Sequence, residues 1–557
     1  MLVLGVTTSA AEPAPVAFDS FTYTGRDAVF DSPLPAGRYR NPILAGFYPD
    51  PSVCRVGDDY YLVNSTFGYF PGIPLFHSRD LVNWTQLGHV IDRPTQLNYD
   101  GVGITRGIFA PALSHHDGTF YLVCTMVDAG GNFVVTATNP AGPWSDPVWL
   151  NFDGIDPSLF FDDDGRAWLV NNGNPPDNQP LYQGHRAIWI QEFDYRARKL
   201  VGPRRIIVNG GVDLAKKPVW IEGPHLYRRN GWYYLCCAEG GTSVQHSQVI
   251  LRSKSVTGPF VPWDQNPILT QRDLDSAAPH AITCTGHADL VIGPDGQWWS
   301  TFLACRPYAG GKLWATGRET FLLPVTWTDD GWPVILPRGE RVPYVSKAPA
   351  GPALVAGPRP ADKRQPCMES LTGNFTWHDD FDQPALSFAW IMARAPKEKW
   401  WQLAGGHLNL VPRADRLSGK GNPSFLARRI QHAKFEAAAK LEVPAAIGTS
   451  AGLVLFQSEN HHYYFAIKRT AAGLEAFLEK WNGQAAEILA SKPLGSTKSV
   501  TLTVAVDERQ SSFSLTADDG QPVVLVPAED ALAITVQAAG DGLHFTGAVV
   551  GLHARTE

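Results

Sequence analysis

Three acidic residues, Asp50, Asp156 and Glu222, stand at matching points of an internal repeat. Like charges that are brought together out of water raise one another's pKa, and carboxyls with unequal pKa values can serve as an acid and a base. Hydrolysis of a glycosidic bond uses such a pair: a carboxylic acid protonates the leaving oxygen, and a carboxylate activates water or attacks carbon. The three residues are therefore the first candidates for a catalytic set of this kind.

The repeat consists of five hairpins, each with a short apolar strand, a turn and an aromatic-rich strand. Their second turn residues, at positions 58, 118, 165, 231 and 296, lie 47 to 66 residues apart. Repeats of this kind predict the blades of a five-bladed β-propeller. Because the first strand of each blade lines the central channel, the residues that begin these strands would face one another there: Asp50, Ala110, Asp156, Glu222 and His287.

The composition favours an all-β protein without a nucleic-acid or membrane partner. Aromatic residues make up 11% of the 557 residues, and 52 Gly with 44 Pro are too many helix breakers for a helical bundle. The net charge is −7 and no long Lys/Arg cluster occurs, which argues against binding to phosphate backbones. No apolar run reaches the roughly 18 residues that would cross a bilayer.

The chain divides into four segments. Residues 346–367 are rich in Pro, Ala and Gly and predict a linker between a propeller over 35–345 and a second domain over 368–557. Residues 1–34 are assigned to an N-terminal tail, whose apolar start and following small residues resemble the end of a secretory signal. This predicts a secreted or periplasmic protein; because a basic region is missing, a plain disordered tail is the alternative.

The second domain has alternating strands with short turns, which predicts a β-sandwich. The expected strands cover 424–430, 450–457, 461–469, 499–507 and 511–517. The string GTSAG (448–452) matches the G-x-S-x-G nucleophile motif, but that motif needs a helix after the turn, and the following residues have the pattern of a strand. A serine hydrolase is therefore rejected.

Several motifs resemble glycoside hydrolase family 43, which contains β-xylosidases and α-L-arabinofuranosidases. The resemblance covers residues 35–340. The motifs include GFYPDPS (46–52), GIDPSLFFDDDGRAWLV (154–170), IEGPHLY (221–227), AEGGTS (238–243) and TGRETFLLPVTW (316–327). It implies a five-bladed propeller, a concanavalin-like jelly-roll sandwich and an inverting, single-displacement mechanism.

The resemblance also implies roles for individual residues. Asp50 would be the general base, Glu222 the general acid, and Asp156 the residue that orients the acid and tunes its pKa. Arg318 would bind sugar hydroxyls near the acid. His287 matches a histidine of the channel that holds a calcium ion through water, so Ca²⁺ is a candidate ligand and no organic cofactor is expected.

Further residues are expected to bind the sugar. Aromatic rings stack on the apolar faces of sugars, and this makes Phe47, Phe67 and Phe109 candidates for the pocket wall, with blade packing as the alternative for each. Thr242, in AEGGTS, is a further candidate. A loop of the sandwich that contains Phe545 would close the pocket; alternatively, the sandwich binds polysaccharide as a separate module.

The expected activity is release of terminal β-D-xylose from xylo-oligosaccharides by an exo-acting enzyme. An α-L-arabinofuranosidase acting on arabinoxylan or arabinan side chains is the closest alternative, and both activities in one protein are compatible with the motifs. A retaining glycosidase and a lectin that keeps the propeller without catalysis are the other classes. The sequence does not separate the two sugars and says nothing about the oligomeric state.

Overall fold

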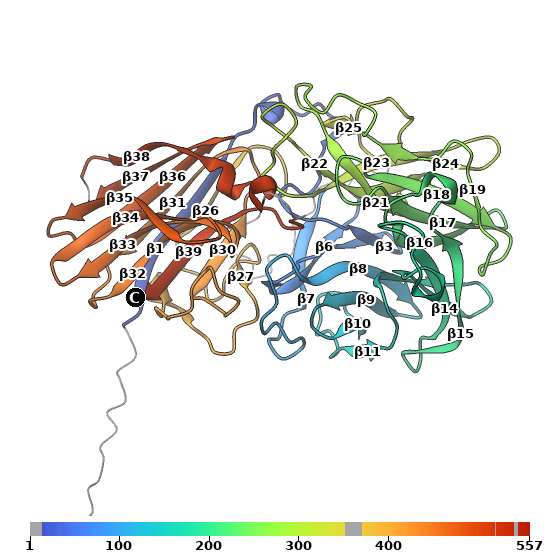
Figure 1. The fold of residues 1–557 in the computed structure, drawn as a ribbon, viewed down its shortest axis with the longest axis horizontal. Coiled ribbons are helices and arrows are strands. Elements are labelled where there is room, and N and C mark those ends of the chain that lie inside the picture. Colours follow the sequence, from blue (N-terminus) through green and yellow to red (C-terminus); the bar gives the residue numbers. More distant parts are fainter. Residues whose placement is uncertain (1–13, 351–369, 519, 540–543) are drawn as a thin grey trace, which may run out of the picture.

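Two β domains lie side by side in the protein, the sandwich on the left and the propeller on the right of Figure 1. The computed structural model describes residues 14–350, 370–518, 520–539 and 544–557. Five sheets form the propeller, and two eight-stranded sheets form the sandwich. This confirms the predicted all-β fold of a five-bladed propeller followed by a concanavalin-like sandwich. Within the described part of the chain, no helix is long and apolar enough to cross a lipid bilayer.

Each blade begins with its inner strand and continues outward. Blade 1 contains β3 (Ser52–Val56), β4 (Asp59–Val63), β6 (Gly72–Ser78) and β7 (Thr85–Ile91). Blade 2 contains β8 (Gly107–His116), β9 (Thr119–Val127), β10 (Gly131–Ala137) and β11 (Val148–Leu150). Blade 3 contains β12 (Ile155–Phe161), β13 (Ala167–Gly173), β14 (Ala187–Asp194) and β15 (Lys199–Asn209). Blade 4 contains β16 (Glu222–Arg229), β17 (Trp232–Glu239), β18 (Ser247–Ser253), β19 (Val261–Pro262) and β20 (Leu269–Thr270). Blade 5 contains β21 (Thr283–Ile292), β22 (Trp298–Cys305), β23 (Glu319–Trp327) and β24 (Pro333–Val334).

The five inner strands form a closed ring, in which each contacts the next and β21 contacts β3. Tyr60, Tyr234 and Trp299, which follow three of the predicted turns, are buried between blades. The aromatic residues after the turns therefore contribute to blade packing, as the repeat predicts. Outside the blades, β2 (Arg38–Arg40) pairs with β25 (Val345–Lys347).

The sandwich consists of two sheets. The first has the order β28 (Trp401–Ala404), β29 (His407–Leu410), β1 (Val16–Gly25), β31 (Lys434–Glu442), β36 (Ser499–Asp507), β37 (Gln510–Ala517) and β38 (Val523–Asp530), with β26 (Phe375–Asp379) also paired to β1. The second has the order β35 (Ala486–Leu494), β34 (Gly473–Trp481), β33 (His461–Thr470), β32 (Thr449–Ser458), β39 (Val549–Thr556), β30 (Phe425–Arg429), β27 (Ile391–Ala393) and β5 (Tyr69–Phe70). Ser450 of the rejected G-x-S-x-G match lies inside β32, fully buried.

The N-terminal segment corrects one prediction. Residues 1–34 are not all tail, because Val16–Gly25 forms β1 between β29 and β31 of the first sandwich sheet. Phe18, Phe21 and Tyr23 of this strand are fully buried, so hydrophobic burial holds it in place. The apolar start, Met1–Glu12, and most of the predicted linker lie outside the described residues.

The two domains share hydrogen bonds as well as a sheet. β5 belongs to the propeller sequence but forms the last strand of the second sandwich sheet, where Tyr69 pairs with Ala393. Glu459 Oε1 of the sandwich accepts a hydrogen bond from the backbone N–H of Ile104 at 2.8 Å. Arg429 Nε donates to the backbone oxygen of Phe47 at 2.9 Å. These contacts fix the sandwich against the segments that precede β3, β6 and β8.

Candidate active site

The site lies where the inner strands begin, at one end of the central channel. Four of the five inner strands carry a residue with positive φ at the same point: Ala110, Asp156, Gly223 and His287. Asp50, directly before β3, has the same conformation. The register of the ladder shifts at these points in β8, β12, β16 and β21, so each is a bulge that redirects a side chain. Positive φ is strained for Asp and His, and such strain gathers at functional sites.

The bulges correct the predicted alignment of blade 4. Gly223, with φ of 55°, is the structural equivalent of Asp50 and Asp156, whose φ angles are 52° and 53°. The sequence repeat predicted Glu222 as this equivalent, and the structure corrects it: Glu222 is the residue before Gly223. Glycine is required at position 223 for a second reason, since a Cβ there would lie 2.9 Å from His287 Nε2. The bulge leaves Glu222 as the last residue before the kink, where it pairs with Ala238.

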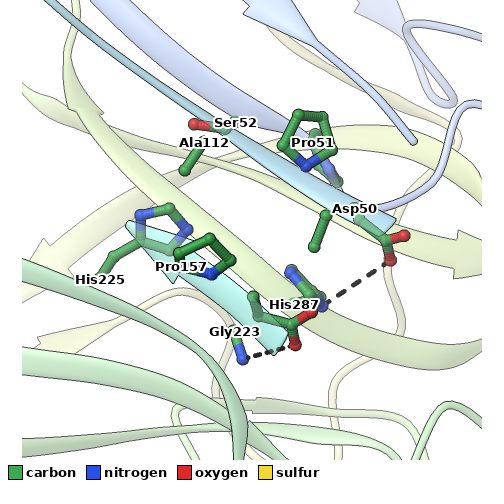
Figure 2. Close-up of a pocket in the computed structure, with 11 residues that line it drawn as sticks. Asp50, Pro51, Ser52, Ala112, Pro157, Gly223, His225 and His287 are labelled. Carbon is green, nitrogen blue, oxygen red and sulfur yellow. Dashed lines mark hydrogen bonds and ion pairs between the residues drawn. The ribbon is translucent and has the colours of Figure 1, made fainter. Parts of the chain in front are cut away.

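Asp50 is held ionised by its partners. Arg318 Nη1 donates to Asp50 Oδ1 at 2.8 Å, and Ser65 Oγ donates to Oδ2 at 2.7 Å. Figure 2 shows Asp50 and His287 side by side in the channel, where His287 Nδ1 lies 3.7 Å from Asp50 Oδ1. Burial raises the pKa of Asp50, but the Arg318 charge and the other partners outweigh it, so the pKa lies below its usual value. Burial also lowers the pKa of His287 to about 4, which leaves this imidazole neutral near pH 7.

Asp156 and Glu222 have the opposite electrostatics. Both side chains are buried, with 5% and 9% of their surfaces exposed. Burial and the Asp50 charge raise the pKa of Asp156 to about 7, although the Gly223 N–H donates to its Oδ2 at 3.1 Å. Burial, followed by the charges of Asp156 and Asp50, raises the pKa of Glu222 well above its usual value. One end of the channel therefore holds a carboxyl with a lowered pKa on blade 1 and a carboxyl with a strongly raised pKa on blade 4.

A loop of the sandwich contributes an aromatic ring to the site. The Phe545 ring stacks on Phe67 at a centroid distance of 6.0 Å and meets Phe109 edge-on at 5.4 Å. The loop is anchored on both sides, because the Phe545 N–H donates to Thr105 Oγ1 and the Phe545 carbonyl accepts from Arg318 Nη2. The Arg318 guanidinium lies 5.7 Å from the Phe67 ring centroid and 5.4 Å from that of Phe545. The predicted contact between the sandwich and the site is thus present.

The other predicted sugar-binding residues separate into two groups. Thr242 belongs to the site, since its Oγ1 accepts a hydrogen bond from Arg318 Nη1 at 3.1 Å. Phe47 does not line the pocket: its ring is fully buried, packs against Tyr69 at 5.3 Å and lies under the Arg429 guanidinium. For Phe47, packing between the domains is therefore the arrangement that the structure supports.

The pocket in the channel has both nitrogen and oxygen atoms that could face a metal ion. It is lined by the imidazoles of His225 and His287 and by the oxygens of Asp50, Asp156 and Ser52. However, Arg318 already binds Asp50 and the Ser52 hydroxyl donates to Asp289, whereas calcium prefers several oxygen ligands. No three His, Cys, Asp or Glu side chains gather as metal ligands in the described ranges. The residues do not fit a directly coordinated Ca²⁺, and an ion held through water at His287 stays a prediction.

Three residues of the site were not expected from the sequence. Ser65 donates a hydrogen bond to Asp50. His246 is buried and acts electrostatically on Asp50, and its Nδ1 lies 3.0 Å from the backbone oxygen of Cys284. Arg186 lies near the acids, where its charge lowers the pKa of both Glu222 and Asp156. Ser65 directly follows the first hairpin and could have been suspected, but Arg186 comes from the long β13–β14 connection, which carries no repeat signal.

Two buried carboxyls on nonadjacent blades, one with a lowered and one with a raised pKa, form the kind of pair that a glycoside hydrolase uses. The comparisons agree. The model of glycosyl hydrolases family 43 matches residues 39–333, and that of the beta xylosidase C-terminal concanavalin A-like domain matches 378–557. The chain belongs to glycoside hydrolase family 43, in its group of xylosidases and arabinosidases.

Several characterised relatives are similar along most of their length. A xylosidase/arabinosidase of Butyrivibrio fibrisolvens is 42% identical and covers 77% of this chain and 80% of its own. A non-reducing end alpha-L-arabinofuranosidase of Bacteroides ovatus is 36% identical and covers 93% and 91%. Among solved structures, a GH43_12 protein from a capybara gut metagenome is 40% identical, with a TM-score of 0.88 and coverage of 98% and 100%. A xylan beta-1,4-xylosidase from Bacillus halodurans is 34% identical, with a TM-score of 0.82 and coverage of 93% and 97%.

Proposed function

We propose that this protein is an inverting exo-glycosidase that removes terminal β-D-xylose from xylo-oligosaccharides. The observation that carries the proposal is the opposite electrostatics of its buried carboxyls: Arg318 binds Asp50 and the pKa of Asp50 lies below its usual value, whereas burial and the neighbouring carboxyls raise the pKa of Glu222 well above its own. Asp50 would take a proton from water as the water attacks the anomeric carbon, and Glu222 would give its proton to the leaving oxygen. Asp156 would keep Glu222 protonated and, through Gly223, fix the bulge beside it.

The exo action is supported by the loop around Phe545. Its ring and carbonyl meet Phe67, Phe109 and Arg318 on the blade 1, 2 and 5 side of the site. A chain that continued past the terminal sugar on that side would meet this loop. The pocket would therefore accept one terminal residue, held by the donors of Arg318 and the hydroxyl of Thr242.

The alternative function is that of an α-L-arabinofuranosidase, alone or together with xylosidase activity. It is favoured by the Bacteroides ovatus relative, which covers nearly the whole chain and carries that name. A paired assay with 4-nitrophenyl β-D-xyloside and 4-nitrophenyl α-L-arabinofuranoside tests the choice. We expect a higher kcat/KM for the xyloside; a higher kcat/KM for the arabinoside would overturn it. Proton NMR of the first product should show an inverted anomeric centre.

A further inference from the structure

Blade 3 carries a row of aromatic rings and arginines beside the active site. The row consists of Trp220, Arg186, Trp189, Arg204 and Phe152, and we call it the arginine–aromatic track. The Arg186 guanidinium lies 4.5 Å from the Trp220 ring centroid. The Arg204 guanidinium lies 4.5 Å from the Trp189 centroid and 5.7 Å from the Phe152 centroid. All five side chains are partly exposed, so the track forms part of the surface.

The track lies at the channel end that holds the carboxyls. Ile155, next to Asp156, pairs with Asn172, and the neighbouring Asn171 pairs with Trp189 on the next strand. Trp220 is two residues before Glu222. Gly173 makes room for the row, since a Cβ there would lie 2.6 Å from the Trp189 ring and 3.2 Å from Arg204 Nη2. The track therefore runs outward over blade 3 from the acid.

Neutral groups hold both arginines in place. Arg186 Nε and Nη1 donate to the side-chain oxygens of Asn172 and Asn174. Arg204 Nη2 donates to the backbone oxygen of Asp153 and to Asn171 Oδ1. Among the residues that the structure describes, the hydrogen bonds of both guanidinium groups go to these neutral oxygens and to no carboxylate. The carboxyls of Glu222 and Asp156 still act electrostatically on Arg186, and that of Asp153 acts on Arg204.

The position of Glu222 determines which part of the substrate lies over the arginine–aromatic track. A general acid protonates the oxygen that leaves, so the leaving part of the substrate lies on the side of Glu222. The sandwich covers the other side through Phe545, and β14 and β15 of blade 3 lie on the side of the propeller away from the sandwich (Figure 1). A leaving oligosaccharide would therefore extend over blade 3.

We propose that the arginine–aromatic track binds the leaving oligosaccharide and selects chains that carry a carboxylate, such as a glucuronic acid substituent. Sugar rings stack on the exposed faces of Trp189 and Trp220. The guanidinium groups of Arg186 and Arg204, which have no carboxylate hydrogen-bonded to them, pair with the carboxylate of the substrate, for which the guanidinium fork is suited. This inference rests on the proposed function and adds the substrate class to it.

The test compares two substrates that differ in one carboxylate. Both have an unsubstituted terminal xylose; the next xylose carries a glucuronic acid in the acidic substrate and the corresponding glucose in the neutral one. We expect the wild type to hydrolyse the acidic substrate with the higher kcat/KM. Raising NaCl from about 0.02 M to about 0.5 M should reduce this preference, because salt screens partly exposed charges.

Arg204→Gln and Trp189→Ala are the test variants, since neither residue touches the carboxyl set. Arg204→Gln should lower the acidic-to-neutral ratio about three- to tenfold, the size of one partly exposed arginine–carboxylate pair. Trp189→Ala should lower kcat/KM for both oligosaccharides. With 4-nitrophenyl β-D-xyloside, which has no leaving sugar, both variants should match the wild type and so demonstrate intact folding.

Arg252→Gln is the matched control. Arg252 also stacks between two tryptophans, at 4.5 Å from Trp232 and 4.0 Å from Trp332, but at the other end of blade 4. The Arg252→Gln variant should leave the ratio of kcat/KM on the acidic and neutral substrates unchanged. The inference is overturned if the wild type does not prefer the acidic substrate, or if Arg204→Gln and Arg252→Gln give the same ratio. Failure of the proposed function has a different result: the wild type would cleave no aryl pentoside at all.

Discussion

Arg318 Nη1 lies 2.8 Å from Asp50 Oδ1, and it is the shortest contact between a cation and the carboxyl set among the described residues. The same nitrogen donates to Thr242, and the other terminal nitrogen donates to the Phe545 carbonyl. One side chain therefore joins blade 1, blade 4 and the sandwich loop. Because Arg318 favours ionised Asp50, the resting site already holds its base in the active form.

Asp50→Asn removes the proposed base. Asp156 and Glu222 both have raised pKa values and neither is bound to Arg318, so we expect kcat to fall by about 10³-fold or more on every substrate. The measurement is kcat with the aryl xyloside. Asp58→Asn, which changes an exposed Asp in the turn of the same blade, should keep full activity. An Asp50→Asn variant with more than a tenth of wild-type kcat would contradict the assignment.

Glu222→Gln removes the proposed acid, and its effect should depend on the leaving group. A 4-nitrophenolate leaves without protonation, whereas the hydroxyl of a sugar needs a proton. We expect a small loss of kcat with the aryl xyloside and a loss of about 10²-fold or more with xylobiose. Equal losses on the two substrates would show that Glu222 does not donate the proton.

Asp156→Asn should shift the pH profile. For the wild type, we expect kcat/KM to fall at low pH as Asp50 is protonated, at a pH below the usual pKa of an Asp. We expect it to fall at high pH as Glu222 loses its proton, well above the usual pKa of a Glu. The Asp156 charge raises the pKa of Glu222, so its removal should move the basic limb to lower pH. A basic limb that stays in place or moves to higher pH would refute this role.

Phe545→Ala should enlarge the pocket. The ring covers Phe67 and Phe109 and lies near the Arg318 guanidinium, so its loss removes one wall and lets water reach the arginine. We expect KM for the aryl xyloside to rise about five- to tenfold, the size of one or two lost aromatic contacts. Phe545→Leu, which keeps most of the volume, should show a smaller increase. An unchanged KM in the alanine variant would mean that the loop does not shape the sugar site.

Much of the propeller follows from local sequence, because each blade repeats a turn and a strand pattern within one segment. The alternating strands at 461–469 and 499–507 were placed within a residue of β33 and β36. The sequence does not predict β1, because its partners in β29 lie almost 400 residues away and those in β31 more than 400, and no local pattern shows which sheet an N-terminal strand joins. The sequence repeat does not single out Gly223, because the distance to the turn is eight residues in some blades and nine in others, so that Gly223 and Glu222 both fit; the backbone angles identify Gly223. Arg186 comes from a connection without periodicity and meets the site only in three dimensions.

The position of β1 makes the propeller an insertion within the sandwich. The chain starts the sandwich with Val16–Gly25, builds all five blades, and then returns to complete the same sheet. During synthesis, β1 is therefore made before the whole propeller, whereas its partner strands β29 and β31 are made after it. A fragment that begins after the linker would lack an inner strand, leaving the facing edges of β29 and β31 unpaired. A cut in the linker would therefore not separate the propeller from a complete sandwich, because β1 would stay with the propeller fragment.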